Sequence, residues 1–527
     1  MADMPDAQEI EALKKALAQA QSELRLVRTE RDLLQEQLNR FKRQLFDAKS
    51  EAAGGAHQKD LFFDEAEAEG AQAQPLGEDG QDGEGDQLDV PAHKRARRGR
   101  KPLDAALPRE VVRHELPEGE RVCPHDGAAL AEIGVEVSEQ LDIIPQQVRV
   151  IRHERVKYAC PCCDGGLRLA PRPPQVIPKG LLTEAALAWV IGAKYLDGLP
   201  LYRQAALLGR FGGAHWSRNT LAAGVVRVGA ATQPVINLLR DALLEAPIVH
   251  GDETEVQVLK EPGRKAQARS YMWVQMTQAS GEDGTGPPIR LFGYRPSRST
   301  EAAKALYEGM RPGAVLMSDG YESYEVVARR HGLVHLGCWA HCRRYFHDAL
   351  QALPKDKRGP DQLAARFIEL IGRLYHVEAQ ARRDEVETQA LLHRRQQHSK
   401  PVLDQIRELA LQHLHGVLPG SLLGKALHYV TAQWPKLERY VQDGSYPIDN
   451  NDCENAIRPF VVGRRNWLFA DTQAGANASA NLYSLLQTCL VNGIDGYRYL
   501  KALLVQLPNA KTAEDFEALL PWRIALT

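Results

Sequence analysis

The sequence predicts a multidomain α/β protein whose core is a mixed β-sheet with a long helical insertion. A chain of 527 residues is long enough for several domains. Short segments rich in β-branched and aromatic residues alternate with amphipathic segments over 247–352. A purely helical pattern then covers 361–440, where Leu, Ile and Val recur three and four residues apart. We therefore assign 247–352 and 441–480 to one core, with 361–440 inserted between them.

The composition narrows the classes of function. No apolar run reaches the roughly 18 residues of a membrane-spanning helix, and no export leader begins the chain, so we expect a cytoplasmic protein without a membrane partner. The formal net charge of −2 hides an asymmetry, because residues 60–90 contain eleven acids and no Lys or Arg. Without those acids the charge would be +9, which suits a nucleic-acid partner.

The first segment, 5–48, predicts a coiled coil of the leucine-zipper type. Apolar residues recur in steps of three and four from Ile10 to Leu45, and only Arg31 interrupts the seam. Self-association into a homo-oligomer is the favoured interpretation; the alternative is a lone amphipathic helix packed on its own chain. Residues 50–92 are rich in Gly, Ala, Asp, Glu and Gln and predict a disordered acidic linker, which disfavours such back-packing.

A basic arm follows at 93–103, with the sequence HKRARRGRKP from His93 to Pro102. Such an arm can lie in a narrow A·T-rich minor groove, where guanidinium groups meet an enhanced negative potential. The residues expected to contact DNA in this AT-hook-like segment are Arg97, Arg98, Arg100 and Lys101. The alternative is a tether that only neutralises the acidic linker.

Residues 104–175 predict a small zinc-ribbon-like, DNA-binding domain. Two cysteine knuckles lie about 35 residues apart, with β-rich segments at 148–151 and 155–158 between them. The candidate zinc ligands are Cys123, His125 or Asp126, Cys160 and Cys163. A complete ribbon would carry Cys at position 126, so the alternative is a degenerate knuckle that folds without metal.

Residues 180–246 predict helices and a possible second contact with DNA. An apolar stripe runs from Leu181 to Tyr195, and Ser217 precedes another helical pattern. A Gly-containing turn at 209–213 could join two short helices into a helix-turn-helix unit. Helical hairpins are also common in proteins that bind no DNA.

The core segments follow a defined order. The expected strands span 248–252, 270–277, 288–294, 315–318 and 332–336, and helices are expected after Ser299, Asp319 and Trp339. Three strands, a helix, a strand, a helix, a strand and a helix make up the ribonuclease-H-like order, in which the first and fourth strands are neighbours. Asp252 ends the expected first strand and Asp319 follows the fourth, so both should project from adjacent strand ends, where ligands gather.

Glu454 is the best third acid, about one turn into a short helix that Asp449 or Asn450 can cap. Three carboxylates suit hard cations such as Mg²⁺ or Mn²⁺. Two such ions can activate an attacking oxygen and stabilise the leaving oxygen at a phosphodiester. A single strand-end acid is more often a cap or a surface charge, and Glu253 and Asp449 compete for the role. The three acids in this fold order nevertheless predict one catalytic metal site.

Side chains near these acids are candidates for DNA contact. Clustered Arg residues beside an aromatic ring can pair with phosphates and stack on exposed bases. The candidates are His341, Arg344, Arg458, Arg464, Arg465 and Trp467. Cys338, His341 and Cys342 can also be interpreted as a second metal site; the alternative is a packed helix start near the acids.

The chain resembles transposases of the insertion sequence 66 family over nearly its whole length. The motifs that carry the resemblance are His250-Gly-Asp-Glu-Thr254, Ser318-Asp-Gly-Tyr321, Gly337-Cys-Trp-Ala-His-Cys-Arg-Arg344, Asp449-Asn-Asn-Asp-Cys-Glu454 and Gly463-Arg-Arg-Asn-Trp-Leu-Phe469. The resemblance implies an Asp-Asp-Glu transposase that uses Asp252, Asp319 and Glu454. It also implies terminal inverted repeats as the substrate and small accessory proteins from the same element. The chain departs from the family at position 126, where a second Cys is common.

These observations predict a bacterial transposase that cleaves and joins DNA strands and is nucleoid-associated when bound to DNA. Residues 481–527 are expected to form a C-terminal helical region. Two other functions stay open: a catalytically inactive DNA-binding regulator and a structure-selective nuclease that cuts without joining.

Overall fold

The computed structural model describes residues 148–159, 167–212, 216–281, 284 and 286–526, with the single positions 27, 31, 34, 38, 111 and 128. The acidic linker, the basic arm and all candidate zinc ligands lie outside the described residues. So does most of the predicted coiled coil, although its seam residues Val27, Leu34 and Leu38 are helical and exposed.

The core is a mixed β-sheet with the strand order β5-β4-β3-β6-β7. Its strands are β3 (Ile248–Lys260), β4 (Arg269–Thr277), β5 (Ile289–Arg295), β6 (Val315–Ser318) and β7 (Val334–Gly337). Strands β3, β4 and β5 form an antiparallel meander, whereas β6 and β7 run parallel to β3. Ile248 pairs with Val315 and His250 with Met317, which confirms the predicted adjacency of the first and fourth strands.

Strand β3 is longer than the sequence analysis predicts. It continues for 13 residues to Lys260, so Asp252 lies inside the strand and not at its end. The polar residues that follow Asp252 hide this extension in the sequence, but Val256 and Val258 beyond them are buried in the core. The far end of β3 pairs with the short strand β8 (Ala470–Thr472), which supplies the neighbour that the extension needs.

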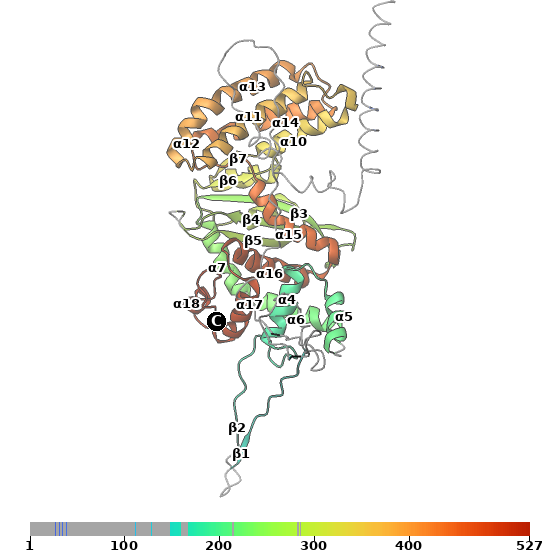
Figure 1. The fold of residues 1–527 in the computed structure, drawn as a ribbon, viewed down its shortest axis with the longest axis vertical. Helices are drawn as coiled ribbons and strands as arrows, with labels where there is room; N and C mark the ends of the chain where they lie inside the picture. Colours follow the sequence, from blue (N-terminus) through green and yellow to red (C-terminus); the bar gives the residue numbers. More distant parts are fainter. Residues whose placement is uncertain are drawn as a thin grey trace, which may run out of the picture.

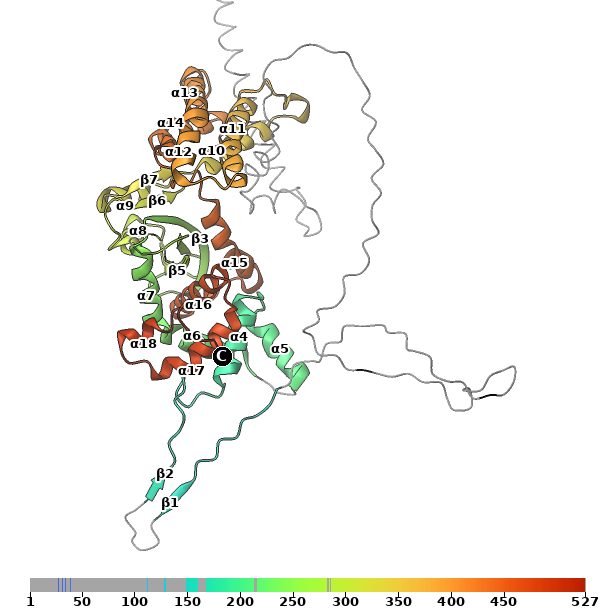
Figure 2. The ribbon, with the colours of Figure 1, turned by 60° about the vertical axis from the view of Figure 1, so that its left-hand side comes forward.

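The prediction of a β-rich segment at 148–151 is wrong. These residues form no strand, and Val148, Val150 and Ile151 are exposed, since no neighbouring strand in the described ranges pairs with them. A two-stranded antiparallel hairpin instead joins β1 (Lys157–Ala159) to β2 (Leu167–Leu169). Figures 1 and 2 show this hairpin extending away from the body of the molecule.

Helices cover both faces of the sheet. On the face that carries Met272 and Val274 lie α4 (Glu184–Tyr195), α6 (Arg218–Ala231), α15 (Asn451–Trp467) and α16 (Gln473–Val491). The face that carries Trp273 and Leu316 packs on α7 (Gln233–Leu244), α8 (Thr300–Tyr307), α9 (Glu322–His331), α17 (Gly496–Gln506) and α18 (Ala513–Glu517), with a 3₁₀ turn at Leu507–Asn509. The alternation of Met272, Trp273 and Val274 between the faces follows from the strand period of two. No helix in the described ranges is long and apolar enough to cross a membrane.

The predicted helical region before the core is integrated into it. Ser217 caps α6 as predicted, its Oγ accepting a hydrogen bond from the Thr220 backbone N at 3.1 Å. The predicted turn at 209–213 is wrong at its start, because α5 (Leu201–Gly212) runs through Gly209 and ends at Gly212; residue 213 lies outside the described residues. Leu187 on α4 and Leu221 on α6 are buried against the sheet, so these helices do not form a free-standing unit.

The segment between β7 and α15 is helical, and Figures 1 and 2 show its helices gathered at one end of the molecule. It comprises α10 (Trp339–Ala352), α11 (Leu363–Arg383), α12 (Thr388–Arg394), a π-helical turn (Arg395–Ser399), α13 (Lys400–Leu414) and α14 (Leu422–Leu437), with 3₁₀ turns at Lys355–Lys357 and Glu438–Gln442. These helices have their own core around Phe346, Phe367 and Leu403. Arg395 forms a buried bidentate pair with Glu378, both contacts being 2.8 Å.

Helix α16 covers the open edge of the sheet with hydroxyl groups. The backbone N of Phe292 donates to Ser484 Oγ at 2.8 Å, and the backbone N of Arg290 donates to Thr488 Oγ1 at 3.1 Å. Thr488 in turn donates to the Arg290 carbonyl, and Asn492 donates to the Pro288 carbonyl. Ser484 and Thr488, four apart on α16, thus bond to alternate residues of edge strand β5, which pairs with no strand on that side in the described part of the chain.

Thr488→Val should lower the free energy of unfolding by about 1–3 kcal/mol, because it leaves a buried backbone N–H and a carbonyl of β5 without partners while preserving side-chain volume. Thr431→Val is the matched control, since the Thr431 hydroxyl bonds only to Leu427 of its own helix. Chemical denaturation of the full chain measures both. Equal stability of the two variants would contradict the edge-covering role of α16.

Candidate active site

Asp252 and Asp319 come from the paired strands β3 and β6. Asp252 lies on β3, and its Oδ1 accepts a hydrogen bond from the Glu253 backbone N at 2.8 Å. Asp319 follows β6, and its Oδ1 accepts from the Tyr321 backbone N at 2.9 Å. Gly251 beside Asp252 leaves room for the Tyr307 hydroxyl, with which any Cβ at that position would collide. The close approach of that hydroxyl therefore requires glycine.

Glu454 comes from α15, four residues after Asn450 at the N-cap position. The helix is 17 residues long and not short as expected, because it continues through Pro459 to Trp467. Asp449, one of the two predicted caps, accepts a hydrogen bond from the Asn451 backbone N at 3.0 Å. Asp449 also accepts from the Tyr375 hydroxyl at 2.7 Å, so this acid joins the helix start to the helical insertion.

Asn450 fixes the start of α15 against the sheet. Its Oδ1 lies 3.0 Å from His250 Nδ1, and its Nδ2 donates to the Gly251 carbonyl at 3.0 Å. Its backbone N donates to Cys338 Sγ at 3.3 Å. All these groups are buried, and together they set where Glu454 lies relative to Asp252.

The charges of the three acids act on one another. Burial, the Glu253 charge and the Asp319 charge raise the pKa of Asp252 well above its usual value. Burial raises the pKa of Glu454 to about 10, and the Asp252 and Asp319 charges contribute. Burial is the largest cause of both shifts, and the neighbouring carboxylates add to it. Bound divalent cations would relieve this repulsion, so the oxygen donors fit Mg²⁺ or Mn²⁺.

Glu253, one of the competing acids, is held by its own partners. Tyr324 donates its hydroxyl to Glu253 Oε2 at 2.5 Å, and Arg298 Nε donates to Oε1. Arg298 also reaches Asp319, with its Nη2 3.6 Å from Oδ2, and lies 3.7 Å from the Tyr321 ring centroid. Arg298 therefore bridges a buried acid and a candidate metal ligand. The sequence analysis did not single out Arg298, because it stands alone before the helix cap at Ser299.

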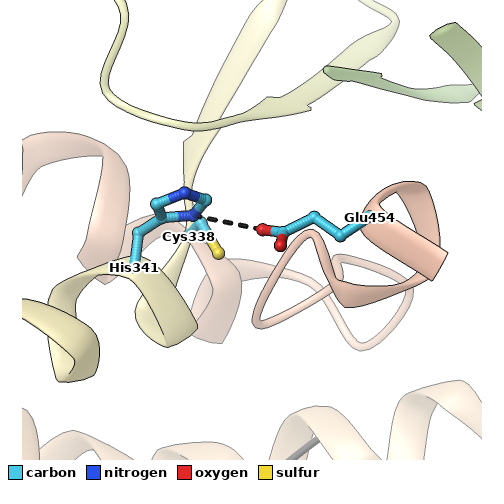
Figure 3. Close-up of side chains that lie close together, drawn as sticks. All are labelled: Cys338, His341 and Glu454. Atoms are coloured by element: carbon cyan, nitrogen blue, oxygen red, sulfur yellow. Dashed lines mark ion pairs between the residues drawn. The ribbon is translucent and has the colours of Figure 1, made fainter. Parts of the chain in front are cut away.

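His341 and Cys338 lie next to Glu454, as Figure 3 shows. Cys338 follows β7 at the N-cap position of α10, His341 lies in the first turn of α10, and His341 Nδ1 is 3.5 Å from Glu454 Oε1. One ligand atom from each of the three residues lies within 4.8 Å of the other two. Cys342, grouped with them in the sequence analysis, instead packs in the helical core.

The basic candidates differ in their surroundings. Arg344 and Arg465 are exposed, Arg458 is half-buried, and Arg464 donates to Thr254 Oγ1 on β3 at 3.2 Å. The predicted role of Trp467 in base stacking is not supported by its place. Its ring packs at 6.1 to 6.3 Å from the rings of Tyr195, Phe460 and Tyr483, and Lys194 Nζ lies 3.9 Å from its centroid. Phe469, just after α15, is the exposed aromatic side chain there.

The raised pKa of Glu454 predicts a pH-dependent effect of magnesium. A carboxyl group whose pKa rises from 4.5 to about 10 on folding stabilises the fold below pH 4.5 and loses that contribution as pH rises towards 10. The metal-free protein should therefore lose thermal stability between about pH 6 and pH 9. Mg²⁺ should restore more stability at the higher pH, because it binds the ionised form.

Glu454→Gln should flatten that pH dependence and remove the gain from Mg²⁺, as measured by thermal unfolding with and without the ion. Glu245→Gln, at an exposed position, is the control and should behave as the wild type. A magnesium gain of the same size in the Glu454→Gln protein would exclude Glu454 as a ligand.

Comparisons with known proteins agree with this architecture. Residues 179–478 match the model described as Transposase IS66 family, and 484–522 match the IS66 C-terminal element. Residues 120–164 match the zinc-finger binding domain of transposase IS66, and 33–112 match Transposase C of IS166 homeodomain.

Two relatives come from Sinorhizobium fredii (strain NBRC 101917 / NGR234). Uncharacterized protein y4qI is 33% identical over 440 residues, covering 81% of this chain and 78% of that protein. Uncharacterized protein y4jD is 30% identical over 426 residues, covering 79% of this chain and 81% of that protein.

A mixed α/β sheet in a chain whose residues 179–478 match a transposase model defines a DNA-processing enzyme. The chain belongs to the IS66 family of transposases.

Proposed function

We propose that the chain binds the terminal inverted repeats of an insertion sequence and catalyses metal-dependent DNA cleavage and strand transfer. The catalytic residues are Asp252, Asp319 and Glu454, on a core of the ribonuclease-H-like type. The observation that carries the proposal is the geometry of the elements that bear the acids. Asp252 and Asp319 lie on or directly after the paired strands β3 and β6, and Asn450 bonds the start of the Glu454 helix to the Gly251 carbonyl beside Asp252.

In this proposal Asp252, Asp319 and Glu454 would hold two Mg²⁺ or Mn²⁺ ions, which would supply Lewis-acid activation of the attacking oxygen and stabilisation of the leaving one. Water first displaces the 3′ oxygen at the element end, so that the P–O3′ bond breaks and a 3′ hydroxyl is freed. That hydroxyl then attacks a phosphodiester of target DNA and forms the new bond as the old one breaks. The protein contributes mainly position and charge.

The chain's own residues have separate tasks. Arg298 offsets the charge of Glu253 beside Asp319, which limits the repulsion at the site. Arg344, Arg458, Arg464 and Arg465 are proposed to bind DNA phosphates, alongside His341. Base stacking by Trp467 stays a prediction, since the half-buried ring also packs on Tyr483 and under Lys194.

Parts of the chain outside the described core complete the proposal. The zinc-finger match over 120–164 supports a zinc site made by Cys123, His125, Cys160 and Cys163, a donor set that suits Zn²⁺. The exposed helical positions Val27, Leu34 and Leu38 support self-association through the coiled coil. The arginines and lysine of the basic arm are proposed to contact the minor groove.

The test is to incubate the full chain with labelled element ends, a target plasmid and Mg²⁺. We expect joined product, which depends on the divalent ion. Cut ends without joining would favour a nuclease, and retarded but uncut DNA would favour an inactive regulator.

A further inference from the structure

Cys338, His341 and Glu454 bring three different metal-ligating groups together beside the proposed catalytic acids (Figure 3). One ligand atom from each residue lies within 4.8 Å of the other two. Cys338 and Glu454 are buried, while 23% of the His341 side chain is exposed and leaves a way in for a small ion. Glu454 Oε1 is buried and accepts no hydrogen bond within the described ranges.

The group is held in place by the starts of two helices, α10 and α15. Cys338 and His341 are three residues apart at the start of α10, so both can face the same side of its first turn. Asn450, at the start of α15, donates its backbone N–H to Cys338 Sγ at 3.3 Å and thereby joins the two helix ends. The ligands are therefore arranged by the fold before any ion binds.

The donor set differs in kind from that of the three acids. Thiolate, imidazole and carboxylate together suit a borderline-soft cation such as Zn²⁺, which takes three protein ligands and leaves a fourth position open. Mg²⁺ prefers oxygen ligands throughout. Glu454 belongs to both sets, so the two kinds of site overlap in one carboxylate.

We propose that Cys338, His341 and Glu454 bind a thiophilic divalent cation such as Zn²⁺, and that this binding inhibits strand cleavage. The ion would take a Glu454 oxygen at about 2 Å and place two positive charges near Asp252 and Asp319. Those charges disfavour a hard cation at the neighbouring acids. The inhibitory half rests on the proposed function, whereas the binding half does not.

Zinc stoichiometry of the full chain tests the binding half, using competition with a chromophoric chelator. Wild type and the control Cys489→Ala, at a buried thiol in α16, should bind one more Zn²⁺ than Cys338→Ser and His341→Gln. All four proteins carry the same N-terminal cysteines, so the difference isolates this site. Thermal unfolding checks that each variant folds. Because Cys338→Ser and His341→Gln each remove one ligand, the test still works if one of the two variants fails to fold. Equal stoichiometry in all four would overturn the proposal.

Glu454→Gln tests the overlap and should also lose that Zn²⁺. If the Glu454→Gln protein still bound that Zn²⁺, Glu454 would not be a ligand of both sites. The inhibition is tested by adding Zn²⁺ to a cleavage reaction that contains Mg²⁺, in an amount one equivalent above what the N-terminal sites bind. The cleavage rate of the wild type should fall at least tenfold, and a chelator should restore it. An unchanged rate with the ion bound would overturn the inhibition. Absence of cleavage even without zinc would instead contradict the proposed function, and the zinc count would still decide the site.

Discussion

Asp319→Asn should reduce Mg²⁺-dependent cleavage of terminal-repeat DNA by roughly a thousandfold or more, a loss of about 4 kcal/mol of transition-state stabilisation. The amide keeps the shape of the side chain, and its oxygen can still accept the hydrogen bond from the Tyr321 backbone N. The negative charge and the strong oxygen ligand are lost. The fold and the binding of DNA ends should therefore persist, because the proposed phosphate contacts are made by other residues.

Cleavage rates and gel retardation on the same labelled end measure the two effects separately. Asp356→Asn, an exposed acid in the helical insertion, is the matched control and should cleave as the wild type does. Cleavage by Asp319→Asn at near wild-type rates would remove this acid from the site.

Asn450→Ala should have the second largest effect, on both stability and activity. It removes the buried contacts to His250 Nδ1 and the Gly251 carbonyl and leaves both groups unsatisfied. We expect a loss of about 2–4 kcal/mol in the free energy of unfolding. Cleavage should fall about a hundredfold in the fraction that is folded, because a small displacement of Glu454 is costly when geometry carries the catalysis.

Chemical denaturation gives the stability loss, and cleavage measured well below the unfolding transition gives the activity loss. Asn509→Ala, at an exposed asparagine near the C-terminus, should change neither. A stable Asn450→Ala protein with full activity would show that Asn450 does not position Glu454.

The order of the strands could be predicted from the sequence because each strand has a strong local signal. Strand β6 matches its predicted bounds, and its four residues are all buried. The length of β3 could not be predicted, because the polar run from Asp252 to Glu255 breaks the apolar pattern in mid-strand. What keeps that run in the sheet is pairing with β4, for example Glu253 with Trp273, which is a long-range interaction.

The three acids proposed as catalytic come from the sequence alone, two of them from the predicted strand order and the third from a distinctive motif, and their catalytic role stays a prediction. Their supporting residues could not. Arg298 becomes part of the site only because the loop between β5 and α8 brings it to Glu253 and Asp319, and Asn450 only because α15 begins against Gly251. No spacing in the sequence encodes either contact.

Trp467 shows what a local sequence pattern leaves out. An aromatic residue beside two arginines fits a nucleic-acid surface, but the pattern does not reveal which side of α15 is covered. In the structure α4 supplies Tyr195 and Lys194, and α16 supplies Tyr483, so the ring is occupied by the protein. Phe469 is exposed instead because it lies just beyond the end of the helix.

Metal-specific rescue tests most directly whether Asp252 and its two partner acids hold catalytic cations. The account predicts that Asp252→Cys does not cleave element ends in Mg²⁺ and recovers cleavage in Mn²⁺, which accepts sulfur ligands more readily. The wild type should cleave element ends with either ion, and a chelator should abolish cleavage in both cases. Cleavage by Asp252→Cys in Mg²⁺ at the wild-type rate would contradict the account.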